Sequence, residues 1–258
     1  MQMAVGLIKK SWLLVLIFLF WQMAITFGAP GKMTPTPLGA GKGLLEMAQT
    51  GVLLKALAIS LTRVFWGFGT AFLLGVSLGI LMGGVKAIER WLDPLIESLR
   101  PIPPIAWVPL AIIWFGLGDT APAFIVALAA LFYILINTIA ATKNVDRLLI
   151  EAAHTLGASR WLIVRGVIIP SALPLILVGA RLGMGAAWMS IIAAELTAGS
   201  RVWAGQLEAG IGELMYRFFA YEPNLNYVVS CMIVIGFVAL AIDGGFRLLH
   251  RSLIRWRP

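Results

Sequence analysis

The chain has 258 residues, of which 60% are hydrophobic and only 12% are charged, and its formal net charge is +8 at pH 7. An ordinary soluble domain has about 25% charged residues and could not bury so much apolar surface in one core, so the composition excludes that class. The basic residues lie between apolar runs and not in a patch with interleaved aromatics, which excludes a nucleic-acid-binding protein. The single cysteine, Cys231, excludes a disulfide framework.

Six apolar runs are long enough to cross a bilayer as helices, because a hydrocarbon core of ~30 Å needs ~20 residues at about 1.5 Å each. Their continuous apolarity favours helices over the alternating pattern of a membrane β-barrel. The sequence therefore predicts an all-α membrane protein in which residues 1–258 form a single transmembrane domain. The predicted spans are residues 11–28, 56–83, 98–117, 121–142, 171–196 and 226–249.

The first run, 11–28, could also be a cleaved signal peptide, since two lysines precede it. No clear A-x-A site follows, and the run is longer than a typical h-region, so a retained helix is favoured. The residues after it, 29–55, contain several prolines and glycines and are predicted to form an external loop with a short amphipathic helix.

The basic residues are unequally shared between the two sides of the predicted membrane domain. Most of the 20 lysines and arginines lie near the N-terminus, around 84–97, in 143–170 and in the C-terminal tail. Cytoplasmic loops carry an excess of Lys and Arg, so both termini and these loops are predicted to be cytoplasmic.

Small residues recur every four positions along the second predicted span, and the fifth span repeats the pattern. Small residues at this spacing let another backbone approach closely. Two interpretations remain open: tight packing within one bundle, or faces that slide as the protein changes state. The residues are Gly67, Ala71, Gly75, Gly79 and Gly83, and then Gly179, Gly183 and Ala187.

Two arginines lie within predicted spans, where a charge costs ~2.5–3.5 kcal/mol at the membrane centre and usually faces protein or water. Arg181, Trp188 and Glu195 are seven residues apart and so lie on one helical face, while Arg63 lies one turn before the glycines of span two. One hypothesis is that the Arg181–Trp188–Glu195 face borders the path of a substrate, with Arg181 suited to an anion. Equally, Arg63 and Arg181 could be satisfied by carbonyls or carboxylates of neighbouring helices.

The segment 143–170 is predicted to be a cytoplasmic loop with two short helices, and we refer to it as the coupling segment. Asp146 can cap a helix over 147–156, because its carboxylate can accept from the free amides of the first turn. Gly157 supplies a flexible turn, and Ser159 can cap a second helix that starts at the next residue.

The residues within these two helices indicate a surface for another protein. Glu151 is exposed in the prediction, and Ala152 and Ala153 leave a shallow face on which a partner could lie. The second helix begins at Arg160, and Pro170 is expected to stop it before the next span.

The stretch from Glu151-Ala152-Ala153 through Gly157 to Pro170 resembles the EAA loop of ABC importer permeases, EAA-x3-G-x9-I-x-L-P. Val167 and Ile169 replace the usual Ile and Leu with side chains of similar bulk. In that family the loop forms coupling helices that dock into a groove of a cytoplasmic ATPase. The resemblance implies that role for Glu151, Ala152, Ala153, Gly157, Ser159, Arg160 and Pro170.

Four further stretches resemble the branch of this family that imports nitrate, sulfonates, taurine and bicarbonate. After Glu195 that resemblance predicts a glycine-rich G-x-G-x-G stretch, but Thr197-Ala198-Gly199-Ser200-Arg201 stands there, which leaves the substrate and the outer gate open. The four stretches are Ser60-Leu61-Thr62-Arg63 running on to Gly67, Arg100-Pro101-Ile102-Pro103-Pro104 running on to Trp107-Val108-Pro109-Leu110, Trp114-Phe115-Gly116, and Ala193-Ala194-Glu195.

The resemblance implies a type I importer fold with six spans in a bacterial inner membrane, a second permease copy in a homodimer, two cytoplasmic ATP-binding subunits, and a periplasmic or lipid-anchored binding protein. The chain itself is expected to be non-catalytic and to hold no cofactor. Around Gly39-Ala40-Gly41-Lys42, Thr36 and Gly43 occupy the places of the first Gly and the Ser or Thr of a phosphate loop. ATP and magnesium are therefore expected on the partner ATPase.

The sequence fits three other classes of membrane protein less well. An ion-gradient-driven secondary transporter would have broken helices and central titratable groups; Pro101, Pro103, Pro104 and Pro109 do break the third run, but central carboxylates are few. An intramembrane enzyme is disfavoured, because only two histidines exist and no H-E-x-x-H or G-x-S-x-G motif occurs. A simple channel would not need the docking pattern.

Overall fold

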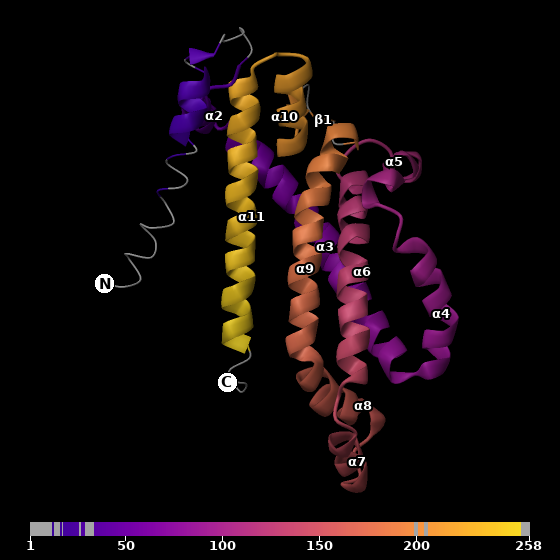
Figure 1. Ribbon diagram of the computed structural model, residues 1–258. Coiled ribbons are helices and arrows are strands. Elements are labelled where there is room, and N and C mark those ends of the chain that lie inside the picture. The colour runs from indigo at the N-terminus through magenta and orange to yellow at the C-terminus, as the bar shows by residue number, and fades with distance from the viewer. Residues whose placement is uncertain are drawn as a thin grey trace.

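The structure is a computed structural model that describes residues 12, 16, 18–25, 27, 28, 34–198, 201–203 and 206–253. The first predicted span, 11–28, lies partly outside these residues. The described chain is helical throughout, apart from one small hairpin of β1 (Arg201–Trp203) and β2 (Gln206–Glu208), so the predicted all-α architecture is confirmed (Figure 1).

Four helices of the described chain are long and apolar enough to cross a membrane. They confirm the second, fourth, fifth and sixth predicted spans as helices. These helices are α3 (Val52–Gly84), α6 (Thr120–Lys143), the run Arg160–Thr197 that contains α9 (Ile169–Ala198), and α11 (Leu225–Leu253).

The third predicted span, 98–117, is not a single straight helix. The chain instead forms α4 (Lys86–Leu99), which occupies the expected loop 84–97, and then the 3-10 turn η1 (Pro104–Trp107) with α5 (Val108–Phe115). The two parts meet at 90°. Prolines between them lack a backbone N–H and disfavour helical geometry in the preceding residue, so they break the helix that the apolar composition suggested. Counting this bent pair as one span gives up to five spans in the described residues.

The small residues of the second and fifth spans pack against α6, which stands beside α9, with α3 crossing behind both helices (Figure 1). A Cβ at Gly79 would lie 2.5 Å from the Thr138 Cβ, and one at Gly183 would lie 3.0 Å from the Ala130 carbonyl oxygen. Both ridges thus bring their backbones against adjoining faces of one helix, and Ile134 contacts glycines of both ridges. This geometry is the tight bundle packing that the spacing predicted.

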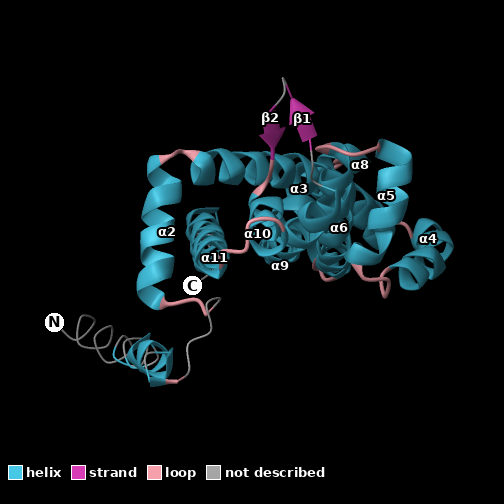
Figure 2. Ribbon diagram, turned by 90° about the horizontal axis from the view of Figure 1, so that it is seen from above, coloured by secondary structure: helices cyan, strands magenta, loops and turns pink. Residues whose placement is uncertain are grey.

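The predicted amphipathic helix before the second span is α2 (Pro37–Gln49). Thr36 caps it by accepting from the Gly39 amide at 2.9 Å, and the Ser230 hydroxyl donates to the Ala40 carbonyl at 2.7 Å. Seen along the bundle, α2 lies across the axis of α11 (Figure 2). It is therefore anchored to the end of α11 rather than inserted among the spans.

The bundle has two distinct ends (Figure 1). The hairpin end carries α2, β1–β2 and α10 (Ile211–Ala220), and the coupling end carries α7 (Arg147–Thr155), α8 (Arg160–Ile163) and the end of α11. The loops that the basic residues marked as cytoplasmic thus gather at one end, and the predicted external segments gather at the other.

Candidate functional site

The coupling segment folds as its residues predict. The Asp146 Oδ1 accepts from the Leu148 amide at 2.9 Å at the start of α7, and the Ser159 Oγ accepts from the Leu162 amide at 3.3 Å at the start of α8. Between the two helices Gly157 has a φ of 76°, in the left-handed region that residues with a Cβ rarely adopt. The angle between α7 and α8 is therefore set by this glycine.

Pro170 does not stop the second helix, contrary to the prediction. Helical structure continues from α8 through the π turn η2 (Val164–Ile168) into α9, where Pro170 lies in the first turn. The wider π turn relieves the clash between a proline ring and the carbonyl one turn earlier. The run Arg160–Thr197 is thus one helix of 38 residues, about 57 Å long, that joins the coupling end to the hairpin end without a loop.

The coupling segment projects beyond the bundle and exposes large apolar side chains (Figure 1). Leu156 is 87% exposed, Leu148 is 70% exposed and Trp161 is 69% exposed. Glu151 and Ala152 are exposed beside them, Ala153 is half-buried, and Arg160, the first residue of α8, is also exposed. An exposed apolar patch of this kind is typical of a protein-docking site. Leu148 and Leu156 were not singled out from the sequence, although helical periodicity places both on the outer surface of α7.

The second candidate site is a buried cluster of charges near the hairpin end. Arg63 on α3 is 2% exposed, and its Nη1 lies 2.9 Å from the Glu195 Oε1 on α9. Its Nη2 lies 2.8 Å from an oxygen of Asp119, the residue before α6. The structure therefore brings together Arg63 and Glu195, two of the predicted path residues, with a carboxylate that the sequence did not point to.

The Glu195 carboxylate also binds the start of α10. The Ser60 hydroxyl donates to Glu195 at 2.7 Å and accepts from the Ile211 amide at 2.9 Å, while the Gly212 amide donates to the Glu195 Oε2 at 3.0 Å. These bonds satisfy first-turn amides that a helix cannot satisfy itself. A Cβ at Gly210 would overlap the Glu195 carboxylate, so the close approach requires glycine. The cluster joins α3, α9 and α10.

Arg181 lies apart from this cluster. Its Nε lies 2.6 Å from the Asp243 Oδ1 on α11, and Arg247 binds the other oxygen of that carboxylate at 2.6 Å. Trp188 is buried and donates its indole N–H to the Ile235 carbonyl at 3.1 Å, also on α11. Arg181 and Trp188 thus both face α11, whereas Glu195 faces α3 and α10. Arg63 and Arg181 thus both pair with carboxylates of neighbouring elements, which was the second of the two interpretations of the sequence.

Within the described residues no three His, Cys, Asp or Glu side chains are placed to hold a metal ion. The described residues instead form a helical bundle with an exposed apolar surface at the coupling end and a buried cluster of paired charges near the hairpin end.

Comparison with known proteins agrees with this architecture. Residues 71–255 match the family model described as binding-protein-dependent transport system inner membrane component. An ABC transporter permease protein of Methanocaldococcus jannaschii is 44% identical over 81% of this chain and 75% of its own length. The taurine transport system permease protein of Escherichia coli is 35% identical over 95% and 87%, and the bicarbonate transport system permease protein of Synechococcus elongatus is 36% identical over 76% and 68%.

The fold also matches solved structures. A chain of a bacterial ABC transporter that imports the acidic polysaccharide alginate superposes with a TM-score of 0.68 at 16% identity, covering 98% of this chain and 96% of that one. At this identity the likeness shows the fold, that of the type I ABC importer permeases. The family match and the relatives together show that this chain is a multi-pass membrane protein and belongs to the binding-protein-dependent transport system inner membrane components, the permeases of ABC importers.

Proposed function

We propose that this chain forms half of the translocation path of an ATP-driven importer for a small anion of the taurine, sulfonate, nitrate or bicarbonate class. The observation that carries the proposal is the coupling segment: an exposed apolar surface on α7 and α8 that continues without a loop into the long helix of α9. A partner bound to this surface would be connected to a membrane-spanning helix without an intervening flexible loop.

The partner of that surface is a cytoplasmic ATP-binding subunit, which also holds the ATP and magnesium. Two such subunits would serve a pair of permeases, the second being another copy of this chain. The docking residues include Glu151, Ala152 and Ala153 on α7, together with the Gly157 turn. Closure of the ATPase pair would displace α8, and α9 would carry the displacement through the bundle. Only an interaction that differs between two states can bias them, so the docking must be tight.

The anion assignment rests on the relatives. Proteins 35% and 36% identical to this chain are named as transporting taurine and bicarbonate, both small molecules with an anionic group. An external binding protein would deliver the anion to the hairpin end. The membrane would be the bacterial plasma membrane, with the coupling end in the cytoplasm, where the excess of basic residues places it. A secondary transporter driven by an ion gradient is not favoured, because the family works with binding proteins.

The experiment is purification of the complex from membranes, identification of the co-purified ATPase, and reconstitution into proteoliposomes. We expect uptake of radiolabelled taurine or bicarbonate that requires both ATP and the binding protein. Uptake that proceeds without ATP and follows an imposed proton or sodium gradient would contradict the proposal.

A further inference from the structure

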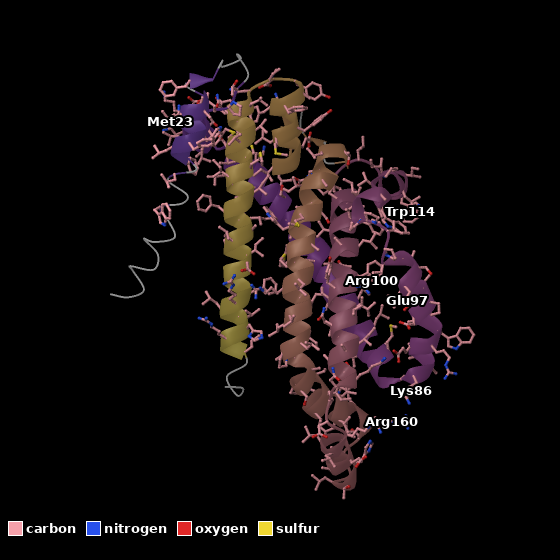
Figure 3. The ribbon with its side chains drawn as sticks, viewed as in Figure 1. Met23, Lys86, Glu97, Arg100, Trp114 and Arg160 are labelled. Atoms are coloured by element: carbon pink, nitrogen blue, oxygen red, sulfur yellow. The ribbon has the colours of Figure 1, made fainter. Side chains whose placement is uncertain are left out.

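The bend between α4 and η1 places an exposed arginine beside the middle of α6. Arg100 follows the last residue of α4, at the point where the chain turns by 90°. It faces α6 at Leu128–Asn137, which is the middle part of that helix, and α9 at Ala186–Ser190. Figure 3 shows Arg100 well above Lys86, where α4 begins at the coupling end. Transporters commonly form their substrate sites at broken helices.

Arg100 lines a cavity of about 360 Å³. The volume is in the range of small-molecule sites. Its apolar walls come from α6 and α9, and its other polar side chains are Tyr133, Asn137 and Ser190. Asn137 donates to the Tyr133 carbonyl, whereas the hydroxyl groups of Tyr133 and Ser190 make no hydrogen bond with any described residue. The cavity therefore offers two hydroxyl donors beside a guanidinium.

The charge of Arg100 is the feature that distinguishes it from the other intramembrane arginines. Arg63 and Arg181 each pair with carboxylates. In the part of the chain that the structure describes, the Arg100 guanidinium has no ion pair and no hydrogen bond. An unpaired charge within a membrane domain is costly and marks a functional site. A guanidinium also matches the planar fork of a carbonate or the oxygens of a sulfonate.

We propose that this cavity is the intramembrane site of the transported anion, with the Arg100 guanidinium as its charge partner and the Tyr133 and Ser190 hydroxyls as further donors. The inference rests on the proposed function and deepens it. It moves the anion-binding role from Arg63 and Arg181, which are already neutralised, to an arginine that is not.

A neighbouring cavity supports a single binding position. It has a volume of about 820 Å³, shares Arg100, and lies between α4 and α6 toward the coupling end. Its lining includes the carboxylates of Glu89, Asp93 and Glu97, and Lys143 there is paired with Glu89. An anion that leaves Arg100 in this direction meets negative charge. These carboxylates would repel an anion, so the second cavity does not offer it another binding position.

The test compares three variants of the reconstituted importer: Arg100→Gln, Arg100→Lys, and the matched control Arg90→Gln, which alters an exposed arginine of the same helix outside both cavities. Because a hydrogen-bonded charge is lost, we expect Arg100→Gln to lower uptake about tenfold or more. ATP hydrolysis stimulated by the binding protein should stay within about twofold, because the docking surface is untouched. Uptake by Arg100→Lys should lie between that of Arg100→Gln and that of the unsubstituted protein, and uptake by Arg90→Gln should equal that of the unsubstituted protein. Unchanged uptake in Arg100→Gln would overturn the assignment.

A second measurement does not depend on the folding of an Arg100 variant. Ser190→Cys places a thiol in the cavity, and Cys231 is buried and can be replaced by Ala as background. Taurine, or bicarbonate if the unsubstituted importer transports that anion instead, should slow labelling of this thiol by a water-soluble reagent. Labelling at an unchanged rate under saturating anion would refute the site. Failure of the proposed function can be told apart from failure of this site. If the proposed function is wrong, the unsubstituted complex itself shows no ATP-dependent uptake of either anion.

Discussion

At the scale of single residues, the buried cluster shows how the fold tolerates charge among apolar helices. The Glu195 carboxylate accepts from a guanidinium and a hydroxyl on α3 and from a backbone amide on α10. A buried charge survives only when every partner is in place. The sequence showed that Arg63 needed a partner. It did not show which one, because the pairing of Arg63 with Asp119 and Glu195 depends on how α3, α6 and α9 pack together.

Removal of the Glu195 charge should therefore destabilise the protein. Glu195→Gln leaves Arg63 with Asp119 alone, and breaking a buried pair costs about 3–5 kcal/mol. The matched control is Glu222→Gln, which breaks the exposed pair with Arg217 and should cost about 0–1 kcal/mol. The measurement is the midpoint of thermal unfolding in detergent. Equal midpoints for the two variants would show that the buried cluster does not hold the hairpin end together.

At the scale of elements, the glycine ridge of α3 makes the close contact with α6. Gly79→Leu should force the two backbones apart, at a cost of about 1–3 kcal/mol for overpacking. Gly69→Leu on the same helix is the control, because a side chain there meets open space. We expect a lower unfolding midpoint and a lower membrane yield for Gly79→Leu only. A loss of the same size in both variants would mean that leucine harms α3 wherever it is placed.

The turn between α7 and α8 is a second element that one residue determines. Proline cannot adopt the φ of 76° at Gly157, so Gly157→Pro should misplace α8 and lower the ATP hydrolysis that the binding protein stimulates, with membrane insertion intact. Asparagine tolerates the left-handed conformation, so Gly157→Asn should keep most of that activity. Wild-type hydrolysis in Gly157→Pro would show that this turn does not couple the ATPase to the bundle.

The elements also show what the sequence could and could not predict. Small residues at a four-residue spacing predicted the packing faces of α3 and α9, because backbone approach depends on side-chain size alone. Asp146 and Ser159 predicted their helix starts, because capping is local. The prolines of the third span predicted that it is broken, but the sequence placed a loop over 84–97 where the helix α4 lies, because composition does not fix the direction that the chain takes at the break. Pro170 was predicted to end a helix, but the helix continues through it. The π turn before it accommodates the proline ring, and composition does not reveal such a turn.

At the scale of the whole molecule, one helix connects the two functional ends. The run that starts at Arg160 in the docking surface contains Glu195 in the buried cluster and ends at Thr197. If α8 docks an ATPase as proposed, its displacement would reach the start of α10 through this one helix. This continuity was hidden in the sequence, since Pro170 suggested a break near the start of the run.

The docking surface itself gives the last prediction. Leu156 is 87% exposed at the tip of the coupling segment, so Leu156→Glu should not harm the fold. It places a charge in an apolar contact, and we expect the amount of co-purified ATPase to fall about tenfold, since docking would bury an unpaired carboxylate. Leu38→Glu is the control, because Leu38 is 70% exposed on α2 at the opposite end. If Leu156→Glu retained the ATPase as fully as Leu38→Glu, α7 would not be the surface through which ATP hydrolysis drives the bundle.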